Sequence, residues 1–429
     1  MKILIKNGRV VSPADGLDGP AHVLIEDGKI AAVGTSREIA EAVADRVIDA
    51  TGKVVTPGLI DMHTHLREPG KPGEETIASG AAAAVAGGFT SVAAMPNTEP
   101  ACDNEAAAEF VYLQAGRANL ANVFPIGAVT KGRAGKELAE IGQLSQAGAV
   151  AFSDDGDSVV NAAVMRCALQ YARMFDRPII SHCEDRTLTE KGVMNESFVS
   201  TVLGLTGMPA AAEEIMVNRD IRLAELTGGK LHIAHVSTRG SVELVRRAKA
   251  RGVRVTAEAT PHHFTLTDEC VRTFDPNFKM NPPLREAEDV AALREALRDG
   301  TIDAIASDHA PHAEEEKELE FSLAPFGVIG MESSLAICIS ELVESGLLTW
   351  PQLVELMAVN PARILGLKKG TLAPGADADV TIIDPKARWT IDARAFRSKS
   401  RNCPFHGRQV VGWVVCTIVR GEVRFELGR

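Results

Sequence analysis

The sequence predicts an α/β protein in which a (β/α)8 barrel of the TIM type is joined to a small β-sandwich domain built from both chain termini. Between residues 57 and 310, eight short apolar runs alternate with helical segments, which is typical of parallel βα units. Both ends of the chain instead carry short runs of alternating apolar and polar residues. Polar residues follow most of the eight runs, as at the catalytic face of a barrel.

The two ends of the chain are expected to form one domain. Residues 1–56 contain the runs KILIKNGRVV, HVLIEDGKIAAVG and VIDATGKVV, and Asp-Gly between such runs is a hairpin signal because both turn positions tolerate positive φ. Residues 367–429 repeat this style in TLAPGADADVTIID and VVGWVVCTIVRGEVRFE. We therefore assign residues 1–56 and 367–429 to the small β domain and residues 57–366 to the barrel.

The barrel strands are predicted from runs that end near residues 63, 95, 129, 154, 182, 236, 260 and 308. In chain order these runs are LIDMHTH, SVAAMPN, NVFPIGAVT, AVAFSDD, PIISHCED, LHIAHVST, VRVTAEATP and AIASDHAPH. Helices are predicted between them, including segments 75–86, 104–118, 159–174, 211–226 and 287–297. Eight such units in about 300 residues fit a closed barrel better than an open sheet.

Composition excludes several classes of protein. The chain has 429 residues, and 57 acidic residues outweigh 46 basic ones to give a net charge of -11, so we expect neither a nucleic acid nor a membrane as partner. The amino terminus is predicted to be a strand, and no stretch approaches the roughly 20 apolar residues of a membrane span. Seven cysteines without CxxC spacing argue against a disulfide framework, so we expect a cytoplasmic protein.

Histidines at strand ends predict a metal site. His63 and His65 are spaced by two, so in an extended chain they point the same way. His182, His235 and Asp308 end the fifth, sixth and eighth strands, and this set of nitrogen and oxygen ligands suits zinc. A buried histidine satisfied by hydrogen bonds is the ordinary explanation for any one of them, but it accounts poorly for all five at strand ends.

Two metal ions would need a bridging anion between them. The fourth strand ends in Asp154-Asp155-Gly156, and either carboxylate could bridge; the alternative is a turn in which one of them caps the next segment.

Any carboxylate of a substrate needs a local cation in so acidic a protein. Arg67, two residues beyond His65, offers a planar fork for it, unless it is an ordinary surface arginine.

Taken together, DMHTHLREPG, MPNT, FSDDG, SHCED, TAEATPHHF, NPPLR and SDHAPH resemble the larger, monofunctional bacterial dihydroorotases of the amidohydrolase superfamily. The resemblance covers nearly the whole chain. It implies a zinc-dependent barrel enzyme that reversibly closes N-carbamoyl-L-aspartate to L-dihydroorotate in pyrimidine biosynthesis. Many amidohydrolases bridge their metals with a carboxylated lysine after strand four, whereas this chain offers Asp155 there and has Lys131 after strand three instead.

The resemblance also implies roles for individual residues. One or two zinc ions are expected, two being favoured with Asp155 as the bridge, and Asp308 is expected to be the general acid and base as well as a ligand. Arg67, Asn97 and His312 would bind the substrate carboxylate, and Asn281 with the backbone of Phe326 and Gly327 would contact the ring amide. The full ligand set is His63, His65, Asp155, His182, His235 and Asp308.

Two other functions remain open from the sequence. Another cyclic-amide hydrolase, such as a hydantoinase, dihydropyrimidinase or allantoinase, would not need Arg67 for a ring carboxylate. A non-catalytic dihydroorotase-like subunit of a transcarbamoylase complex would lack several metal ligands, and this chain keeps them all. We expect a homo-oligomer that can associate with aspartate transcarbamoylase, and segment 312–327 is either a flap over the site or a solvated helix.

Overall fold

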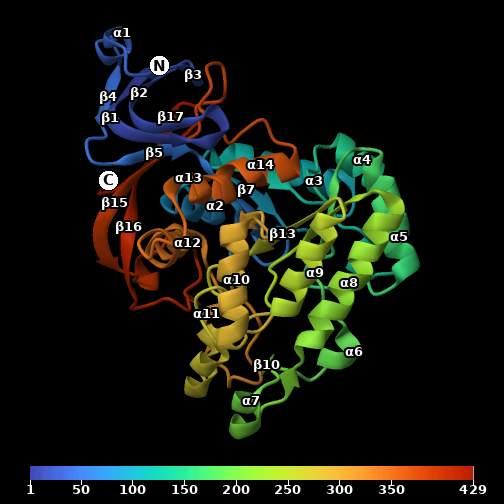
Figure 1. The fold of residues 1–429 in the computed structure, drawn as a ribbon. Helices are drawn as coiled ribbons and strands as arrows, with labels where there is room; N and C mark the ends of the chain where they lie inside the picture. Colours follow the sequence, from blue (N-terminus) through green and yellow to red (C-terminus); the bar gives the residue numbers. More distant parts are fainter. Residues whose placement is uncertain (429) are drawn as a thin grey trace.

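A computed structural model describes residues 1–428 of the chain. The two ends form one eight-stranded sheet of order β17-β16-β15-β5-β1-β2-β3, with β4 paired to β1. They are joined where β15 runs antiparallel to β5, with Val380 opposite Pro57. Figure 1 shows the blue strands of the amino end beside the red strands of the carboxyl end. The strands are β1 (Lys2–Ser12), β2 (Leu17–Glu26), β3 (Lys29–Gly34), β4 (Arg46–Asp49), β5 (Val54–Pro57), β15 (Val380–Thr390), β16 (Gln409–Val419) and β17 (Glu422–Glu426).

Turn chemistry explains the hairpins of this sheet. Asp27 and Gly28, between β2 and β3, have φ of 48° and 78°, and Arg420 and Gly421, between β16 and β17, have φ of 51° and 76°. Two consecutive residues with positive φ give the turn twist that matches antiparallel strands. Strands from both ends share one apolar core, so the prediction of a single domain assembled from both termini is confirmed.

The middle of the chain forms the predicted parallel barrel. One arc is β6-β7-β8 and the other is β9-β12-β13-β14. Bridges from Phe152 to Gly127 and Ile179 join the arcs on one side, and a bridge between Thr64 and His309 closes the ring on the other. The strands are β6 (Leu59–Thr64), β7 (Phe89–Ala94), β8 (Asn122–Pro125), β9 (Pro178–Ser181), β12 (Lys230–Ile233), β13 (Val255–Ala259) and β14 (Ala304–Ile305).

The fourth strand is shorter than the run AVAFSDD predicts, because regular pairing is limited to Phe152. Just beyond it, the Asp154 carboxylate accepts hydrogen bonds from the backbone N–H groups of Val129 (2.9 Å) and Thr130 (3.0 Å). These bonds tie the end of the fourth strand to the segment that follows β8.

Helices cover the barrel, and α5, α8, α9 and α10 stand side by side in Figure 1. Side-chain caps set two starts later than predicted: Thr76 begins α2 in a capping box, and Asn161 caps α5. The longer helices are α2 (Ile77–Ala86), α3 (Glu105–Ala118), α5 (Ala162–Arg173), α8 (Ala210–Thr227), α9 (Arg239–Ala250), α10 (Ala287–Asp299) and α12 (Met331–Cys338). The shorter elements are α1 (Arg37–Ala40), α4 (Ile141–Gln146), α6 (Arg186–Thr189), α7 (Phe198–Leu203), α11 (Glu314–Lys317), α13 (Trp350–Val354), α14 (Asn360–Leu365), β10 (Met194–Asn195) and β11 (Gly207–Met208).

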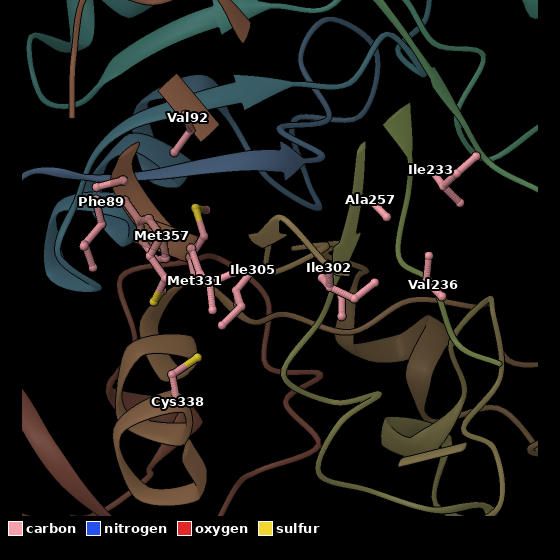
Figure 2. Packing of buried hydrophobic residues seen from close by; sticks show 14 of the residues in the cluster. Phe89, Val92, Ile233, Val236, Ala257, Ile302, Ile305, Met331, Cys338 and Met357 are labelled. Atoms are coloured by element: carbon pink, nitrogen blue, oxygen red, sulfur yellow. The ribbon is translucent and has the colours of Figure 1, made fainter. Parts of the chain in front are cut away.

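One apolar core runs through the barrel wall and its helices. Phe89 of β7 and Met331 and Cys338 of α12 are buried in it, and Figure 2 shows Met357 packed against them. Burial of each such large side chain stabilises the fold by roughly 1.5–3 kcal/mol. Among residues 1–428, no helix combines the length and hydropathy needed to cross a membrane.

The segment between β15 and β16 returns to the barrel and contacts its catalytic face. The buried Asn402 donates from Nδ2 to the carbonyls of Ala310 and Gly327, both at 3.1 Å, and its own carbonyl accepts from Ile329 N–H at 3.0 Å. Nearby, Ser398 Oγ donates to the buried Glu75 carboxylate at 2.5 Å. A segment close to the carboxyl end of the chain therefore supports two loops at the mouth of the barrel.

Candidate active site

Strand ends bring the predicted ligands together at one end of the barrel. His63 Nε2 lies 3.4 Å from Asp308 Oδ1 and 3.5 Å from Asp155 Oδ1. His65 Nε2 lies 3.1 Å from Asp308 Oδ1 and 3.5 Å from Asp155 Oδ2. All four residues are buried. Two imidazoles and two carboxylates from β6, the fourth strand and the loop after β14 thus face one point.

A second group of ligands lies on the other side of Asp155. His182 Nδ1 is 2.9 Å from His235 Nε2, and these two nitrogen atoms lie 3.6 Å and 3.4 Å from Asp155 Oδ1. Asp155 therefore stands between the His63/His65 pair and the His182/His235 pair. All six predicted ligands are therefore brought together around Asp155.

The neighbouring Asp154 has a different environment. Both of its carboxylate oxygens accept hydrogen bonds, from the backbone of Val129 and Thr130 and from the Thr130 hydroxyl. Burial raises the pKa of Asp154, and these hydrogen bonds oppose that rise. The choice that the sequence leaves open thus resolves geometrically: Asp155 faces the histidines and Asp154 holds the backbone.

The ligand atoms fit a bound cation. His63 Nε2 and Asp155 Oδ1 are buried and have no hydrogen-bond partner among residues 1–428. In a tetrahedral zinc site with bonds of about 2.0–2.1 Å, neighbouring ligand atoms lie about 3.3–3.4 Å apart, and the separations here run from 2.9 to 3.6 Å. Burial opposes protonation of His63, yet Asp155, Asp308 and Glu258 raise its pKa well above the usual value. The charges around this centre therefore favour a positive ion.

Buried acceptors hold the imidazole rings in place. Glu258 of β13 lies 2.6 Å from His63 Nδ1 and 3.2 Å from His232 Nε2, and it also accepts from His235 N–H at 3.3 Å. Although burial would raise it, the pKa of Glu258 falls to about 2 because of the His63 and His232 imidazoles. On His65, Nδ1 lies 2.8 Å from Asn97 Oδ1. A carboxylate or amide oxygen on one ring nitrogen leaves the other nitrogen free for a metal.

A cavity of about 490 Å³ opens directly over the ligands. The predicted substrate residues all border it, together with four of the six predicted ligands: the lining includes His65, Arg67, Asn97, Asp155, His182, Glu184, Asn281, Asp308, His312, Phe326 and Gly327. Its size suits a small cyclic or linear metabolite.

Arg67 is a buried arginine and not a surface one. Its side chain is only 12% exposed. The Nε atom donates a hydrogen bond to the carbonyl of Pro311 at 3.0 Å and lies 3.1 Å from Glu74 Oε2. The Nη2 atom lies 3.5 Å from His312 Nε2. Its φ of 58° is in the left-handed region, which turns the side chain back into the cavity wall. The surface alternative for this arginine is therefore wrong.

Glu74, His312 and Glu316 also approach one another within 4.8 Å. Their geometry resembles a second cation site, but Glu74 already contacts two cations, Arg67 and Lys71 (2.8 Å). This group is thus an ion-pair network around the guanidinium of Arg67. Burial and the nearby Arg67 lower the pKa of His312 to about 3, so the imidazole is neutral at physiological pH.

The carbonyl of Phe326 and both backbone groups of Gly327 have partners inside the protein. The Phe326 carbonyl lies 2.7 Å from His312 Nε2, and the Gly327 N–H donates to Lys279 O at 3.0 Å. The Gly327 carbonyl accepts from Lys317 Nζ at 2.9 Å as well as from Asn402. Both positions border the cavity, and their expected contact with the ring amide stays a prediction.

Several important side chains were not singled out by the sequence. Glu184 follows β9 and Glu258 lies within β13, but neither carries a metal motif of its own, and Asn402 lies far away in the chain. His232 shares the Glu258 carboxylate with His63. The Sγ atom of Cys183 contacts Ser181 and Asp220.

Two family models and several curated proteins match the chain over most of its length. A family model described as "Dihydro-orotase-like" matches residues 52–241, and one described as "Amidohydrolase family" matches residues 210–425. The dihydroorotase of Pelotomaculum thermopropionicum is 59% identical over 423 residues, covering 99% of this chain and 98% of that protein. The dihydroorotase of Syntrophus aciditrophicus is 53% identical over 431 residues, covering 99% and 100%.

Solved structures agree on the fold. The L-hydantoinase (dihydropyrimidinase) from Arthrobacter aurescens has a TM-score of 0.88 at 31% identity and covers 100% of this chain and 96% of its own. The D-hydantoinase (dihydropyrimidinase) from Thermus sp. has a TM-score of 0.83 at 27% identity, with coverage of 100% and 96%. Both of the dihydroorotases named above are at least 53% identical to the chain over nearly its whole length, and the chain belongs to the dihydroorotase family of the amidohydrolases.

Proposed function

We propose that this chain catalyses the reversible closure of N-carbamoyl-L-aspartate to L-dihydroorotate and water, in pyrimidine biosynthesis. The observation that carries the proposal is one cavity in which a buried arginine, Arg67, stands beside a cluster of six metal ligands. Substrate and product both carry a carboxylate next to the ring amide, so an enzyme for them needs a cation and an amide-activating centre side by side.

We assign two zinc ions to the cluster, held by His63, His65 and Asp308 on one side and His182 and His235 on the other, with Asp155 shared. Bound there, such ions would polarise the amide carbonyl and lower the pKa of a water molecule toward neutrality. The protein itself orients the imidazole rings so that the Nε2 lone pairs face the metal positions. Glu258 does this through a hydrogen bond to Nδ1 of His63, and Asn97 through one to Nδ1 of His65.

Asp308 is the residue assigned to move protons. In ring closure it would accept the proton that the ureido nitrogen loses as the new C–N bond forms, and it would pass that proton to the departing carboxylate oxygen, which leaves as hydroxide and becomes water by taking one more proton from the solvent. Ring opening reverses both transfers. Burial alone would raise the pKa of Asp308, but His63 and His65 lower it below the usual range, so the group starts as a carboxylate ready to accept a proton.

Arg67, Asn97 and His312 would bind the substrate carboxylate, and Asn281 would bind the ring amide or the ureido group. All four side chains border the cavity. An arginine that can bind a carboxylate through two hydrogen bonds is needed for dihydroorotate, whereas a ring without a carboxylate does not need it.

A hydantoinase or dihydropyrimidinase is the second candidate, because the solved structures that resemble this chain carry those names. Relatives named dihydroorotase at 53–59% identity favour the first candidate. The test is steady-state turnover of dihydroorotate against dihydrouracil and hydantoin by the zinc-loaded protein. A preference for the two carboxylate-free rings would reject the proposal, and no turnover of any of the three would favour the non-catalytic subunit.

For the cellular setting, we propose a cytoplasmic homo-oligomer that can associate with aspartate transcarbamoylase. All seven cysteines are free thiols, which is in keeping with a reducing compartment. Sedimentation of the protein alone and mixed with the transcarbamoylase would test both associations.

A further inference from the structure

Glu184 stands between the metal ligands and the substrate residues. It follows His182 by two positions, so both side chains leave the extended chain on the same side. Ser158 fixes this stretch, because its hydroxyl donates to the His182 carbonyl at 2.6 Å and accepts from the Glu184 N–H at 3.0 Å. The Glu184 side chain is only 11% exposed and borders the cavity. A carboxylate held this firmly in a cavity needs partners of its own.

One oxygen of Glu184 contacts both halves of the site. Oε2 lies 3.1 Å from His182 Nε2 and accepts from Asn281 Nδ2 at 3.0 Å. The other oxygen, Oε1, accepts from the hydroxyl of Thr189. The same carboxylate thus orients a metal ligand and an amide side chain that comes from a distant loop.

Each contact has a chemical consequence. An ionised carboxylate can only accept, so the His182 Nε2 must carry the proton and its Nδ1 keeps a lone pair, which faces Asp155 and His235. Asn281 donates one of its amide N–H groups to Glu184. This hydrogen bond fixes the orientation of the amide, with the nitrogen toward the carboxylate and the oxygen available to other partners.

We propose that Glu184 is a positioning residue that couples the His182 side of the metal centre to the Asn281 contact with the substrate. The inference rests on the proposed function and deepens it. It requires that one substitution at Glu184 weakens metal binding and substrate binding together, although the residue itself ligates no metal.

The test compares Glu184→Gln with Glu190→Gln. Glu190 borders the same cavity but is exposed, and its substitution removes the same charge without touching His182 or Asn281. Metal-free proteins are titrated with cobalt(II), and the visible absorbance of the bound ion gives the affinity without any need for turnover. We expect Glu184→Gln to bind the weaker of two ions about 10–100-fold less tightly, and Glu190→Gln to match the wild type. Equal affinities for the two variants would overturn the assignment.

A double-mutant cycle tests the link to the substrate. If Glu184 acts through Asn281, the rise in KM for dihydroorotate that Glu184→Gln causes should disappear in an Asn281→Ala background. Additive effects on KM would overturn the coupling. Thr189→Val, which removes the third contact alone, should lower cobalt affinity in the same direction but less; it keeps the test decisive if Glu184→Gln folds poorly. Because the cobalt titration needs no turnover, a wild type inactive on dihydroorotate would refute the proposed function, whereas the titration would still decide whether Glu184 positions His182 for the metal.

Discussion

The substitution Asp308→Asn separates proton transfer from metal binding. Asp308 has a φ of 47°, in the left-handed region, where asparagine and aspartate are the side chains best tolerated after glycine. Asparagine is also isosteric, and its amide oxygen can still face His65 Nε2, now 3.1 Å from the carboxylate, and His63 Nε2 at 3.4 Å. The backbone should therefore hold, while the group can no longer accept a proton.

The size of the effect follows from the chemistry removed. A positioned general acid or base contributes about 10²–10⁴-fold to turnover, which corresponds to about 2.7–5.4 kcal/mol of transition-state stabilisation. Loss of one negative charge also weakens the metal centre, so the metal content must be measured in the same sample. We expect kcat to fall by about 10²–10⁴-fold in both reaction directions at a comparable metal load.

The assay is steady-state turnover of dihydroorotate and of carbamoyl-aspartate, with metal analysis and a thermal unfolding scan of each preparation. Asp154→Asn is the matched control, since Asp154 bonds to the backbone of Val129 and Thr130 and faces no predicted ligand. It should lower stability by about 1–3 kcal/mol with little change in kcat per bound metal. Wild-type turnover by metal-loaded Asp308→Asn would refute the proton-transfer role.

Three further predictions follow from the same structure. Arg67→Met should raise KM for dihydroorotate by about 10–100-fold, since a hydrogen bond to a charged group is worth about 1.5–3 kcal/mol, and an unchanged KM would remove Arg67 from the site. Chelation should abolish turnover and added zinc should restore it, whereas full activity in a preparation shown by metal analysis to be metal-free would contradict the metal centre. Burial, and then Lys279, lower the pKa of Lys317 from 10.5 to about 7, so above about pH 7 the unfolded chain binds a proton that the folded protein does not. Urea unfolding should then show the wild type gaining up to about 2 kcal/mol over Lys317→Met between about pH 6.5 and pH 8.5; parallel pH profiles would contradict the shift.

The fold could be predicted from the sequence because periodicity and turn chemistry act locally. The alternation of apolar and polar residues at both ends, and the Asp27-Gly28 turn, specify antiparallel strands without knowledge of their partners. The strand-end rule then placed His63, His182, His235 and Asp308 at one face before any distance was known.

The remainder depends on long-range geometry that a single sequence does not contain. Glu258 of β13 reaches His63 of β6 across 195 positions, and β14 lies between these two strands in the barrel wall, so only the closed barrel reveals the contact. The choice between Asp154 and Asp155 needed the backbone direction after Phe152, where strand pairing stops. The partners of the Gly327 backbone came from Lys279, Lys317 and Asn402.

The bonds of Asn402 bear on how the small domain can vary in sequence or be engineered. Its side chain joins the carbonyls of Ala310 and Gly327, which lie 92 and 75 positions earlier in the chain. Deleting the carboxyl-terminal segment, or grafting one from a relative with a different residue here, would free two loops that frame the substrate. The segment between β15 and β16 thus helps to hold Ala310 and Gly327, two residues of the cavity wall, in place.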